Sequence, residues 1–325
     1  MGSEMCESTA YRMIGSSSAM RNIYALIDKV KDITAPVFIG GESGTGKELV
    51  ARNIHHLGLR GGGPFVALNC GAIPENLLES ELLGYTKGSF TGACQDRKGL
   101  IEEAHRGSLF LDEIGDLSLN LQAKLLRFLQ EKDIRRIGEN RRRRVDVRFI
   151  SATNKCIEQE VEAGRFREDL YYRLKIISIE LPPLRERRSD IRELADYYLQ
   201  KFGRECGCPD AVLTNQAIAV LSAYAWPGNV RELQNEIQRC LILSGSRNRI
   251  EVEHLSSRIR KTVNQHIPPR NNFFKARNEF EKIYVHKALA RYNYNRSQTA
   301  EEIGISRQGL FKLIKKHRIE IPPQA

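Results

Sequence analysis

The sequence has few of the features that would place a protein outside the cytosol. It shows no charged-then-apolar leader and no run of about 18 apolar residues, so it predicts neither secretion nor a membrane span. Its seven cysteines are odd in number and spread over 325 residues, which argues against a disulfide framework. Cys206 and Cys208 lack a second pair or a suitably spaced His, so they indicate a turn and not a zinc site. We expect a cytoplasmic protein with reduced thiols and no membrane contact.

Aspartate is missing from the C-terminal part of the chain, and basic residues dominate there. From Arg258 to Ala325 there are 15 Lys and Arg against 5 Glu, a net charge of +10, whereas the whole chain carries +11. A compact basic module is the electrostatic footprint of binding to a phosphate backbone, although basic surfaces also serve solubility. Charge alone therefore leaves nucleic-acid binding and simple solubility as two interpretations of this tail.

Apolar periodicity divides the chain into five segments. Residues 1–16 are polar and patternless, and we expect an N-terminal extension without structure. Residues 17–182 alternate short apolar strands with helices, which predicts an α/β domain whose parallel sheet is covered by helices on both faces. Residues 183–255 are predicted to form a small helical lid. Residues 256–272 have the composition of a linker, and residues 273–325 are predicted to form an all-α module.

The expected helices and strands of the α/β segment follow from these periods. The expected strands span residues 36–40, 65–69, 108–111, 147–152 and 176–181, and the expected helices span residues 17–31, 47–56, 75–83 and 118–132. In the last helix, Leu119, Ala123, Leu126 and Leu129 are predicted to share the buried face. The lid helices are expected at residues 191–204, 215–225 and 230–244.

A glycine-rich loop joins the first expected strand to the helix that follows it. It reads Gly41, Glu42, Ser43, Gly44, Thr45, Gly46, Lys47, and we call it the phosphate loop. Such a loop turns backbone N–H groups toward phosphate oxygens, and the helix N-terminus adds a favourable dipole. Lys47 would bind the β and γ phosphates. Glu48 follows, where the general motif has a Ser or Thr that holds magnesium.

Two adjacent acids end the strand at residues 108–111. Four apolar or small residues carry Asp112 and Glu113 to the carboxyl end of a central strand, where they would face the phosphates. Asp112 would order Mg²⁺, and Glu113 would polarise the attacking water. Adjacent acids at a strand end are also common as helix N-caps, but their partnership with Lys47 favours the catalytic interpretation.

A polar insertion between Leu83 and Gly99 exceeds what a minimal nucleotide-binding fold needs. Insertions of this kind are functional or disordered. Two glycines would let its tip turn tightly and expose an aromatic and a hydroxyl side chain, although the aromatic ring would otherwise pack back on its own domain. The tip reads Gly88, Ser89, Phe90, Thr91, Gly92, Ala93. A second hairpin tip is expected to carry Arg141–Arg144, either solvated or in contact with DNA or with the first loop.

These motifs together resemble the AAA+ activators of sigma-54 RNA polymerase, the NtrC-like bacterial enhancer-binding proteins. The family hexapeptide is GAFTGA, and Ser89 replaces its second-position alanine. The family's phosphate loop continues with glutamate, so Glu48 conforms to it. The resemblance covers about residues 12–320. It implies that the tip residues Gly88–Ala93 bind sigma-54.

The resemblance also implies roles for further residues around the nucleotide. Asn69 matches the switch asparagine that holds the catalytic glutamate until ATP binds, and Asn154 matches the sensor of the γ phosphate. Arg167 and Arg173 align with the arginine fingers that a neighbouring subunit supplies. Arg231, within Trp226–Leu233, matches the lid arginine that contacts nucleotide in cis.

The tail resembles the Fis-like helix-turn-helix that ends NtrC-like proteins. Ser297–Lys312 reads as a helix, a turn at Gly304 and a second helix. The second helix, about residues 306–317, would enter the major groove with Leu310, Leu313 and Ile314 packed inward. The expected DNA contacts are Gln298, Ser306, Arg307, Gln308 and Lys312, with Lys315 and Lys316 serving phosphates. Dimers would form through the preceding helix.

The function that the resemblance implies is ATP-dependent activation of transcription. Such a protein binds double-stranded DNA upstream of promoters, assembles from dimers into a hexameric or heptameric ring with ATP and Mg²⁺, and remodels the sigma-54 holoenzyme. One alternative is a DNA-binding regulator of AAA+ fold that acts on polymerase without remodelling. Another is a generic AAA+ motor with a different client.

Overall fold

A five-stranded parallel sheet organises the first of the two units into which the chain divides, Met1–Ser256 and Ser257–Ala325. The computed structural model describes residues 11–244, 248–264, 273–292, 294–317 and 319. None of the helices in these ranges has the length and apolar character needed to cross a bilayer. The strands run in the order β2 (Phe65–Asn69), β5 (Ser108–Asp112), β8 (Arg148–Thr153), β1 (Val37–Gly40), β9 (Ile177–Glu180).

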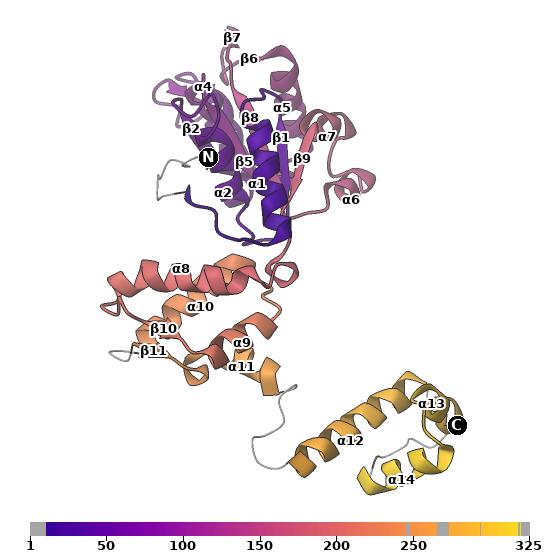
Figure 1. Ribbon diagram of the computed structural model, residues 1–325. Helices are drawn as coiled ribbons and strands as arrows, with labels where there is room; N and C mark the ends of the chain where they lie inside the picture. The colour runs from indigo at the N-terminus through magenta and orange to yellow at the C-terminus, as the bar shows by residue number, and fades with distance from the viewer. Residues whose placement is uncertain (1–10, 245–247, 265–272, 293, 318, 320–325) are drawn as a thin grey trace. The chain divides into compact units, whose positions relative to one another are not determined.

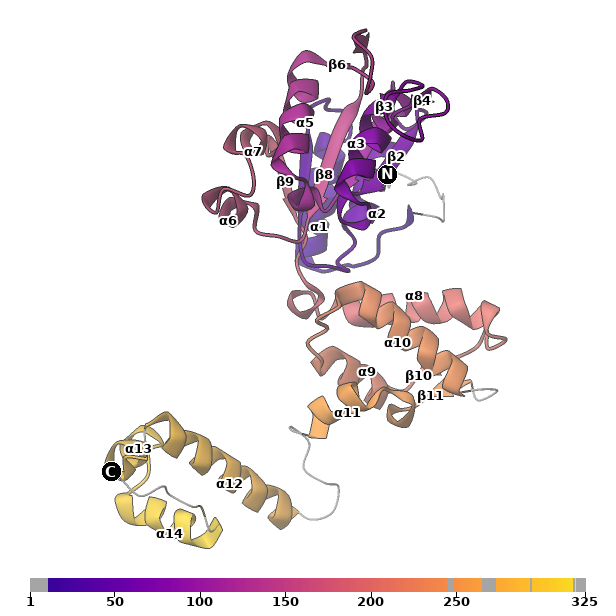
Figure 2. The same ribbon diagram turned by 180° about the vertical axis from the view of Figure 1, so that it is seen from behind.

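Helices cover both faces of this sheet, as the sequence predicts (Figures 1 and 2). Strand residues alternate between two cores: Val37 and Ile39 pack with one face, and Phe38 packs with the other. The first core is covered by α1 (Ser18–Val30) and α2 (Lys47–His56). The second is covered by α3 (Glu75–Leu83), α4 (Leu100–Glu103), α5 (Leu119–Glu131), α6 (Ile157–Glu162) and α7 (Glu168–Leu174).

Two short hairpins interrupt the alternation. The first consists of β3 (Gly84–Tyr85) and β4 (Arg97–Lys98), and it carries the tip at residues 88–93. The second consists of β6 (Asp133–Ile134) and β7 (Arg143–Arg144). The two hairpins touch through a parallel bridge between Tyr85 and Ile137. The predicted insertion is therefore an ordered loop that rests on a second loop.

The lid begins after the last strand with the short turn η4 (Leu184–Glu186) and is mainly helical. It comprises α8 (Asp190–Glu205), α9 (Asn215–Ala223) and α10 (Asn229–Ser244). The sequence did not predict the short parallel pair of β10 (Val212–Leu213) and β11 (Arg249–Ile250). Two-residue strands carry no period, so they leave no signal in the apolar pattern.

The second unit contains four helices among its described residues. They are α11 (Ser257–Asn264), α12 (Phe273–Arg291), α13 (Arg296–Glu302) and α14 (Arg307–His317). Val285, Leu289, Ala300, Leu310 and Ile319 form the small core on which the last three helices pack. Residues 257–264, expected to be linker, are helical instead, and Ile259 is buried. The remainder of that expected linker, residues 265–272, lies outside the described residues.

Two further expectations about local structure are wrong. In α5 the buried stripe contains Leu121, Leu125 and Phe128 beside Leu126 and Leu129, while Leu119 is 48% exposed. Leu119 is the first helical residue, and the core lies against the following turns. The end of the expected unstructured extension, residues 11–16, is also ordered: the Ser16 and Ser17 N–H groups donate to Asp190 at 3.0 and 2.8 Å, and the Tyr11 ring stacks on His56.

Candidate functional site

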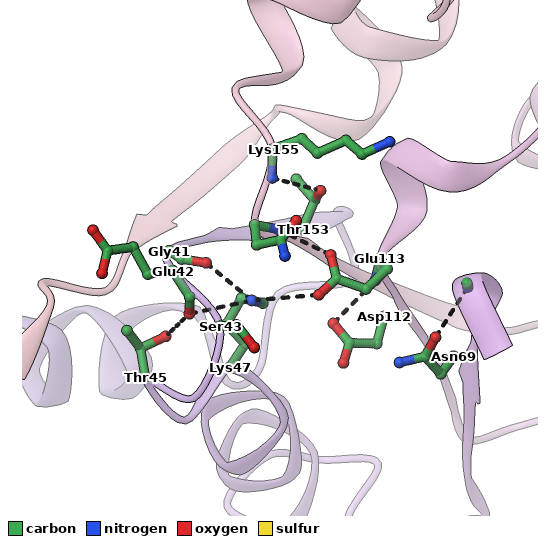
Figure 3. Close-up of polar contacts among 12 residues, drawn as sticks. Gly41, Glu42, Ser43, Thr45, Lys47, Asn69, Asp112, Glu113, Thr153 and Lys155 are labelled. Carbon is green, nitrogen blue, oxygen red and sulfur yellow. Dashed lines mark hydrogen bonds and ion pairs between the residues drawn. The ribbon is translucent and has the colours of Figure 1, made fainter. Parts of the chain in front are cut away.

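The phosphate loop connects β1 to α2 and opens at the carboxyl edge of the sheet. Gly41, Gly44 and Gly46 have positive φ angles of 146°, 78° and 108°, which L side chains rarely adopt. A Cβ added at Gly46 would meet no atom within 4 Å, so the loop faces open space there. The Lys47 Nζ donates to the Gly41 carbonyl at 2.9 Å and lies 3.9 Å from the Glu113 carboxylate (Figure 3).

The two predicted catalytic acids lie at this same edge. The Asp112 Oδ1 accepts the Glu113 backbone N–H at 3.0 Å, and Glu113 has a left-handed backbone with a φ of 52°. Burial raises the pKa of Asp112, an effect that the nearby Lys47 ammonium opposes. The Glu113 Oε2 accepts the Asn154 backbone N–H at 3.1 Å, which places the expected sensor beside the expected base.

Asn69 ends β2 in register with Asp112, so three neighbouring strands bring their polar ends together. Its side-chain oxygen accepts the Gly71 N–H at 3.0 Å and caps the short helix that follows β2. The Glu113 carboxylate instead contacts the Asn154 backbone N–H and the Lys47 ammonium. The switch role of Asn69 therefore stays a prediction.

A cleft of about 550 Å³ extends from the phosphate loop toward the lid. Its polar side contains the phosphate loop, Asn69, Asp112 and Glu113. No sequence motif marks the rest of its lining, so those residues were not predicted. The missed residues include Tyr11, Arg12, Met13, Ile14, Leu181, Arg187, Leu194, Tyr197 and Tyr198. A lining that combines apolar and aromatic side chains with cations suits a nucleoside triphosphate.

Arg187 is the most constrained of these missed residues. It is 3% exposed, and its guanidinium donates to the Thr45 carbonyl of the phosphate loop at 2.9 Å. Burial lowers the pKa of this group. Its position fixes the backbone of the phosphate loop from the lid side.

The first turn of α10 contacts the middle of the phosphate loop. The Val230 and Arg231 N–H groups donate to the Gly44 carbonyl at 3.0 and 3.3 Å. A Cβ on Gly44 would lie 2.4 Å from the Gly228 carbonyl oxygen, so only glycine fits here. The Arg231 guanidinium donates to the Ser43 hydroxyl at 3.1 Å. The expected lid arginine therefore does lie at the cleft.

Asn229 joins three segments and is fully buried. Its Nδ2 donates to the Ser43 carbonyl at 3.0 Å and to the Glu42 carboxylate at 3.1 Å, and its Oδ1 accepts the Leu184 N–H at 2.8 Å. Its φ of 51° is one that asparagine tolerates better than most residues. Sequence reasoning included this residue in the lid motif but gave it no role.

Glu42 points toward the lid. Arg185 binds its carboxylate through two hydrogen bonds of 2.8 and 2.6 Å, and these lower the pKa of Glu42. Glu48 pairs with Arg52 one turn along α2 at 2.7 Å and also lines the cleft. The side chain of Glu42 thus connects the phosphate loop to the lid, a contact that the sequence did not predict.

Trp226, the single tryptophan of the chain, anchors the turn before α10. It is fully buried, its indole N–H donates to the Leu221 carbonyl at 2.7 Å, and Tyr224 meets its ring edge-on at 5.1 Å. This fixed turn sets the direction in which α10 approaches the phosphate loop.

The two expected arginine fingers lie on or beside α7, away from this cleft. Arg167 binds Asp169 through two hydrogen bonds of 3.1 and 2.8 Å and is 42% exposed. Arg173 is exposed and donates to the Leu129 carbonyl at 3.3 Å. Among the described residues neither arginine lines the cleft, so any contact with nucleotide would be with that of another subunit.

The tip at residues 88–93 is a tight, partly exposed turn. The Gly88 N–H donates to the Ala93 carbonyl at 2.9 Å, and the Ala93 N–H donates to the Phe90 carbonyl at 3.1 Å. Phe90 is 42% exposed and meets the Tyr85 ring edge-on at 5.0 Å. Thr91 is exposed. The ring therefore packs partly on its own hairpin while the threonine is free to contact a partner.

Two of the four arginines in the run Arg141–Arg144 on the second hairpin are partly neutralised. Arg142 lies 3.3 Å from Glu131, and Arg143 lies 3.0 Å from Glu139. Ion pairs within the hairpin thus account for part of the charge run.

In the second unit, the buried and exposed faces of α13 and α14 are those that the sequence predicts. Leu310 is buried, and Leu313 and Ile314 pack against the small core. The residues expected to contact DNA, Gln298, Ser306, Arg307, Gln308, Lys312, Lys315 and Lys316, are all exposed. Lys316 also pairs with Glu281 of α12 at 2.7 Å.

This sheet, with a phosphate loop at its carboxyl edge and a helical lid, defines an AAA+ P-loop nucleotide-binding fold. A sigma-54 interaction domain matches residues 13–180, and an AAA+ ATPase lid domain matches residues 185–272. The Fis family of bacterial regulatory proteins matches residues 276–317. The chain belongs to the NtrC-like family of bacterial transcription regulators with a sigma-54 interaction domain.

Several relatives share most of this chain. It is 44% identical over 311 residues to the transcriptional regulatory protein ZraR of Klebsiella oxytoca, covering 94% of this chain and 69% of ZraR. It is 53% identical over 232 residues to the Nif-specific regulatory protein of Azotobacter vinelandii, covering 71% of this chain and only 44% of that protein. The structure of NtrX from Brucella abortus in complex with ATP matches with a TM-score of 0.74 at 34% identity, covering 95% of this chain and 70% of that one.

Proposed function

We propose that this protein is an ATPase that remodels the sigma-54 RNA polymerase holoenzyme and binds DNA upstream of the promoter through its C-terminal unit. One observation carries the proposal: the same domain contains both a nucleotide cleft and an ordered tip that exposes Thr91. A nucleotide-binding protein without a client would not need the second feature.

The residues of the cleft fit ATP with Mg²⁺. The phosphate loop would hold the phosphates with its N–H groups and with Lys47. Asp112 presents a carboxylate of the kind that Mg²⁺ takes beside phosphate oxygens. Mg²⁺, when bound, neutralises charge on those oxygens. Glu113, held by the Asn154 N–H, would accept a proton from the attacking water.

A complete site would need a second subunit. The exposed Arg167 and Arg173 would supply positive charge to the nucleotide of a neighbour, a contribution of about 10³ to 10⁵ in rate. This requirement favours a ring of subunits, in which the tips at residues 88–93 would meet sigma-54 together. The basic C-terminal unit would dimerise and bring the ATPase to upstream DNA.

Promoter opening tests this proposal. Purified sigma-54 holoenzyme, a matching promoter and ATP would be combined with the parent, with Thr91→Ala, or with Thr34→Ala as a matched control at an exposed threonine outside the tip. Open complexes should form with the parent and the control, while Thr91→Ala hydrolyses ATP but opens no promoter. If the parent hydrolyses ATP and binds DNA without opening any promoter, a regulator that does not remodel sigma-54 becomes the better interpretation.

A further inference from the structure

We call the hairpin of β3 and β4 the tip hairpin and the hairpin of β6 and β7 the arginine hairpin. They meet at a small joint, which we call the loop joint and define as residues 84–86, 89, 137 and 138. The Ile137 N–H donates to the Gly84 carbonyl at 2.9 Å, and the Thr86 N–H donates back to the Ile137 carbonyl at 3.0 Å. The Thr86 hydroxyl donates to the same carbonyl at 3.2 Å. Separation of the two hairpins at this joint has to break these hydrogen bonds.

Ser89 packs directly on the main chain of Gly138 within the loop joint. Gly138 has a φ of 82°, and an added Cβ would lie 2.6 Å from the Ser89 Cβ and 2.8 Å from the Thr86 hydroxyl oxygen. The two hairpins therefore touch closely enough at this point that a methyl group does not fit between them.

The Ser89 hydroxyl is buried in this contact and has no hydrogen-bond partner among the described residues. A buried hydroxyl without a partner loses its hydration and gains nothing in return. Once the hairpins separate, water reaches the hydroxyl again. Because the methyl group of alanine loses no such hydration, the closed joint is less stable with serine at position 89 than it would be with alanine.

We propose that Ser89 is a positioning residue that lowers the free energy needed to release the tip from the arginine hairpin. The family signature has alanine here, so this chain releases its tip more readily than an alanine variant would. The residue acts through the position of Phe90 and Thr91. This inference rests on the proposed function only in assuming that the released tip meets sigma-54.

Amide hydrogen exchange of the full-length protein, measured without any sigma factor, tests the proposal. The readout is the exchange of the Thr86 and Ile137 amides, whose hydrogen bonds hold the joint. We expect Ser89→Ala to slow both about tenfold, within the range that an unsatisfied buried hydroxyl accounts for. Gly138→Ala should speed both, because its Cβ forces the hairpins apart.

Ser151→Ala is the matched control, since the Ser151 hydroxyl on β8 is also buried without a partner but lies in the central sheet. It should leave exchange at Thr86 and Ile137 unchanged. If Ser89→Ala leaves both rates unchanged, or if Ser151→Ala slows them equally, the proposal is wrong.

The link to the client has its own measurement, the number of promoters opened per ATP hydrolysed. Ser89→Ala should lower this ratio several-fold, while Ser151→Ala should not. An unchanged ratio together with slowed exchange would overturn the positioning role. If the parent opens no promoter at all, the proposed function fails, whereas the exchange result on the joint still stands.

Discussion

The Asn229 side chain donates a hydrogen bond of 3.0 Å to the Ser43 carbonyl, across the boundary between the lid and the phosphate loop. The same amide group donates to Glu42, and the α10 N-terminus donates to Gly44. The phosphate loop is therefore held from the lid side by backbone and side-chain contacts together. A change in the position of the lid must change the loop that would bind phosphate.

Asn229→Asp should weaken ATP binding at least about tenfold. The new carboxylate would face the Ser43 carbonyl and the Glu42 carboxylate, and two acceptors facing each other repel. Binding would be measured by calorimetry, with circular dichroism as the check on folding. Adding Glu42→Gln should recover part of the affinity, because an amide can again donate. Parent-like binding by Asn229→Asp would show that these hydrogen bonds do not hold the loop.

Arg167→Ala should abolish most ATP hydrolysis while leaving ATP binding nearly unchanged, because Arg167 lies outside the cleft of its own chain. The expected loss in rate is about 10³-fold or more. Glu113→Gln should also be inactive, through loss of the base. Mixing the two inactive variants should restore part of the hydrolysis. At some subunit interfaces an intact Glu113 of one subunit would then meet an intact Arg167 of its neighbour. Mixtures without any activity would argue against a site shared between subunits.

His55 should make the fold sensitive to acid. Its ring is fully buried against Ser108, at 2.9 Å, and burial lowers its pKa from 6.5 to about 4. In the unfolded chain the His55 ring is protonated below about pH 6.5, whereas in the folded chain it stays neutral down to about pH 4. The free energy of unfolding therefore falls as the pH drops through this window, by about 2 kcal/mol between pH 6.5 and 4.5.

Urea unfolding of His55→Gln at these two pH values would measure this effect. The variant should show a smaller fall than the parent, whatever its stability at pH 7. His286→Gln, at an exposed histidine on α12 of the second unit, is the control and should retain the parent's pH dependence. An equal fall in His55→Gln and the parent would remove His55 as the cause.

Lys312 and Lys316 should contribute unequally to DNA binding, although both are exposed on α14. Lys316 already pairs with Glu281 at 2.7 Å, so part of its charge is neutralised inside the unit. Lys312→Ala should lower the slope of log affinity against log salt by about 1, and Lys316→Ala should lower it less. Glu281→Gln should raise affinity at low salt. Equal slopes for the two lysine variants would contradict this assignment.

The elements that position the site could be predicted because they bury regular apolar patterns. The bounds expected for α2 and β2 match those of the structure. Helix α2 buries Val50, Ala51 and Ile54 at helical spacing, and β2 is a short apolar run that follows Pro64 and ends at Asn69. The phosphate loop and the Asp112–Glu113 pair then follow from their places at strand ends. The exposed faces of α13 and α14 could be predicted for the same reason.

The contacts that join the lid to the phosphate loop could not be predicted, because they link residues far apart in sequence through polar groups without a period. Arg185 with Glu42 and Arg187 with Thr45 are examples. The ordering of Tyr11 was missed likewise, since it depends on stacking with His56. Leu119 was wrongly predicted to be buried because it fits the helical period. It is exposed, since it lies at the first position of α5, beyond the core.

The chain's single Trp226 makes it possible to follow the lid optically without any label. Its indole ring is shielded from solvent and lies three residues before Asn229, whose side chain holds the phosphate loop. Since tryptophan occurs nowhere else in the sequence, all emission excited selectively from indole originates at this turn. The protein's own fluorescence would therefore report, in real time and from one known position, on the structure that connects nucleotide to lid.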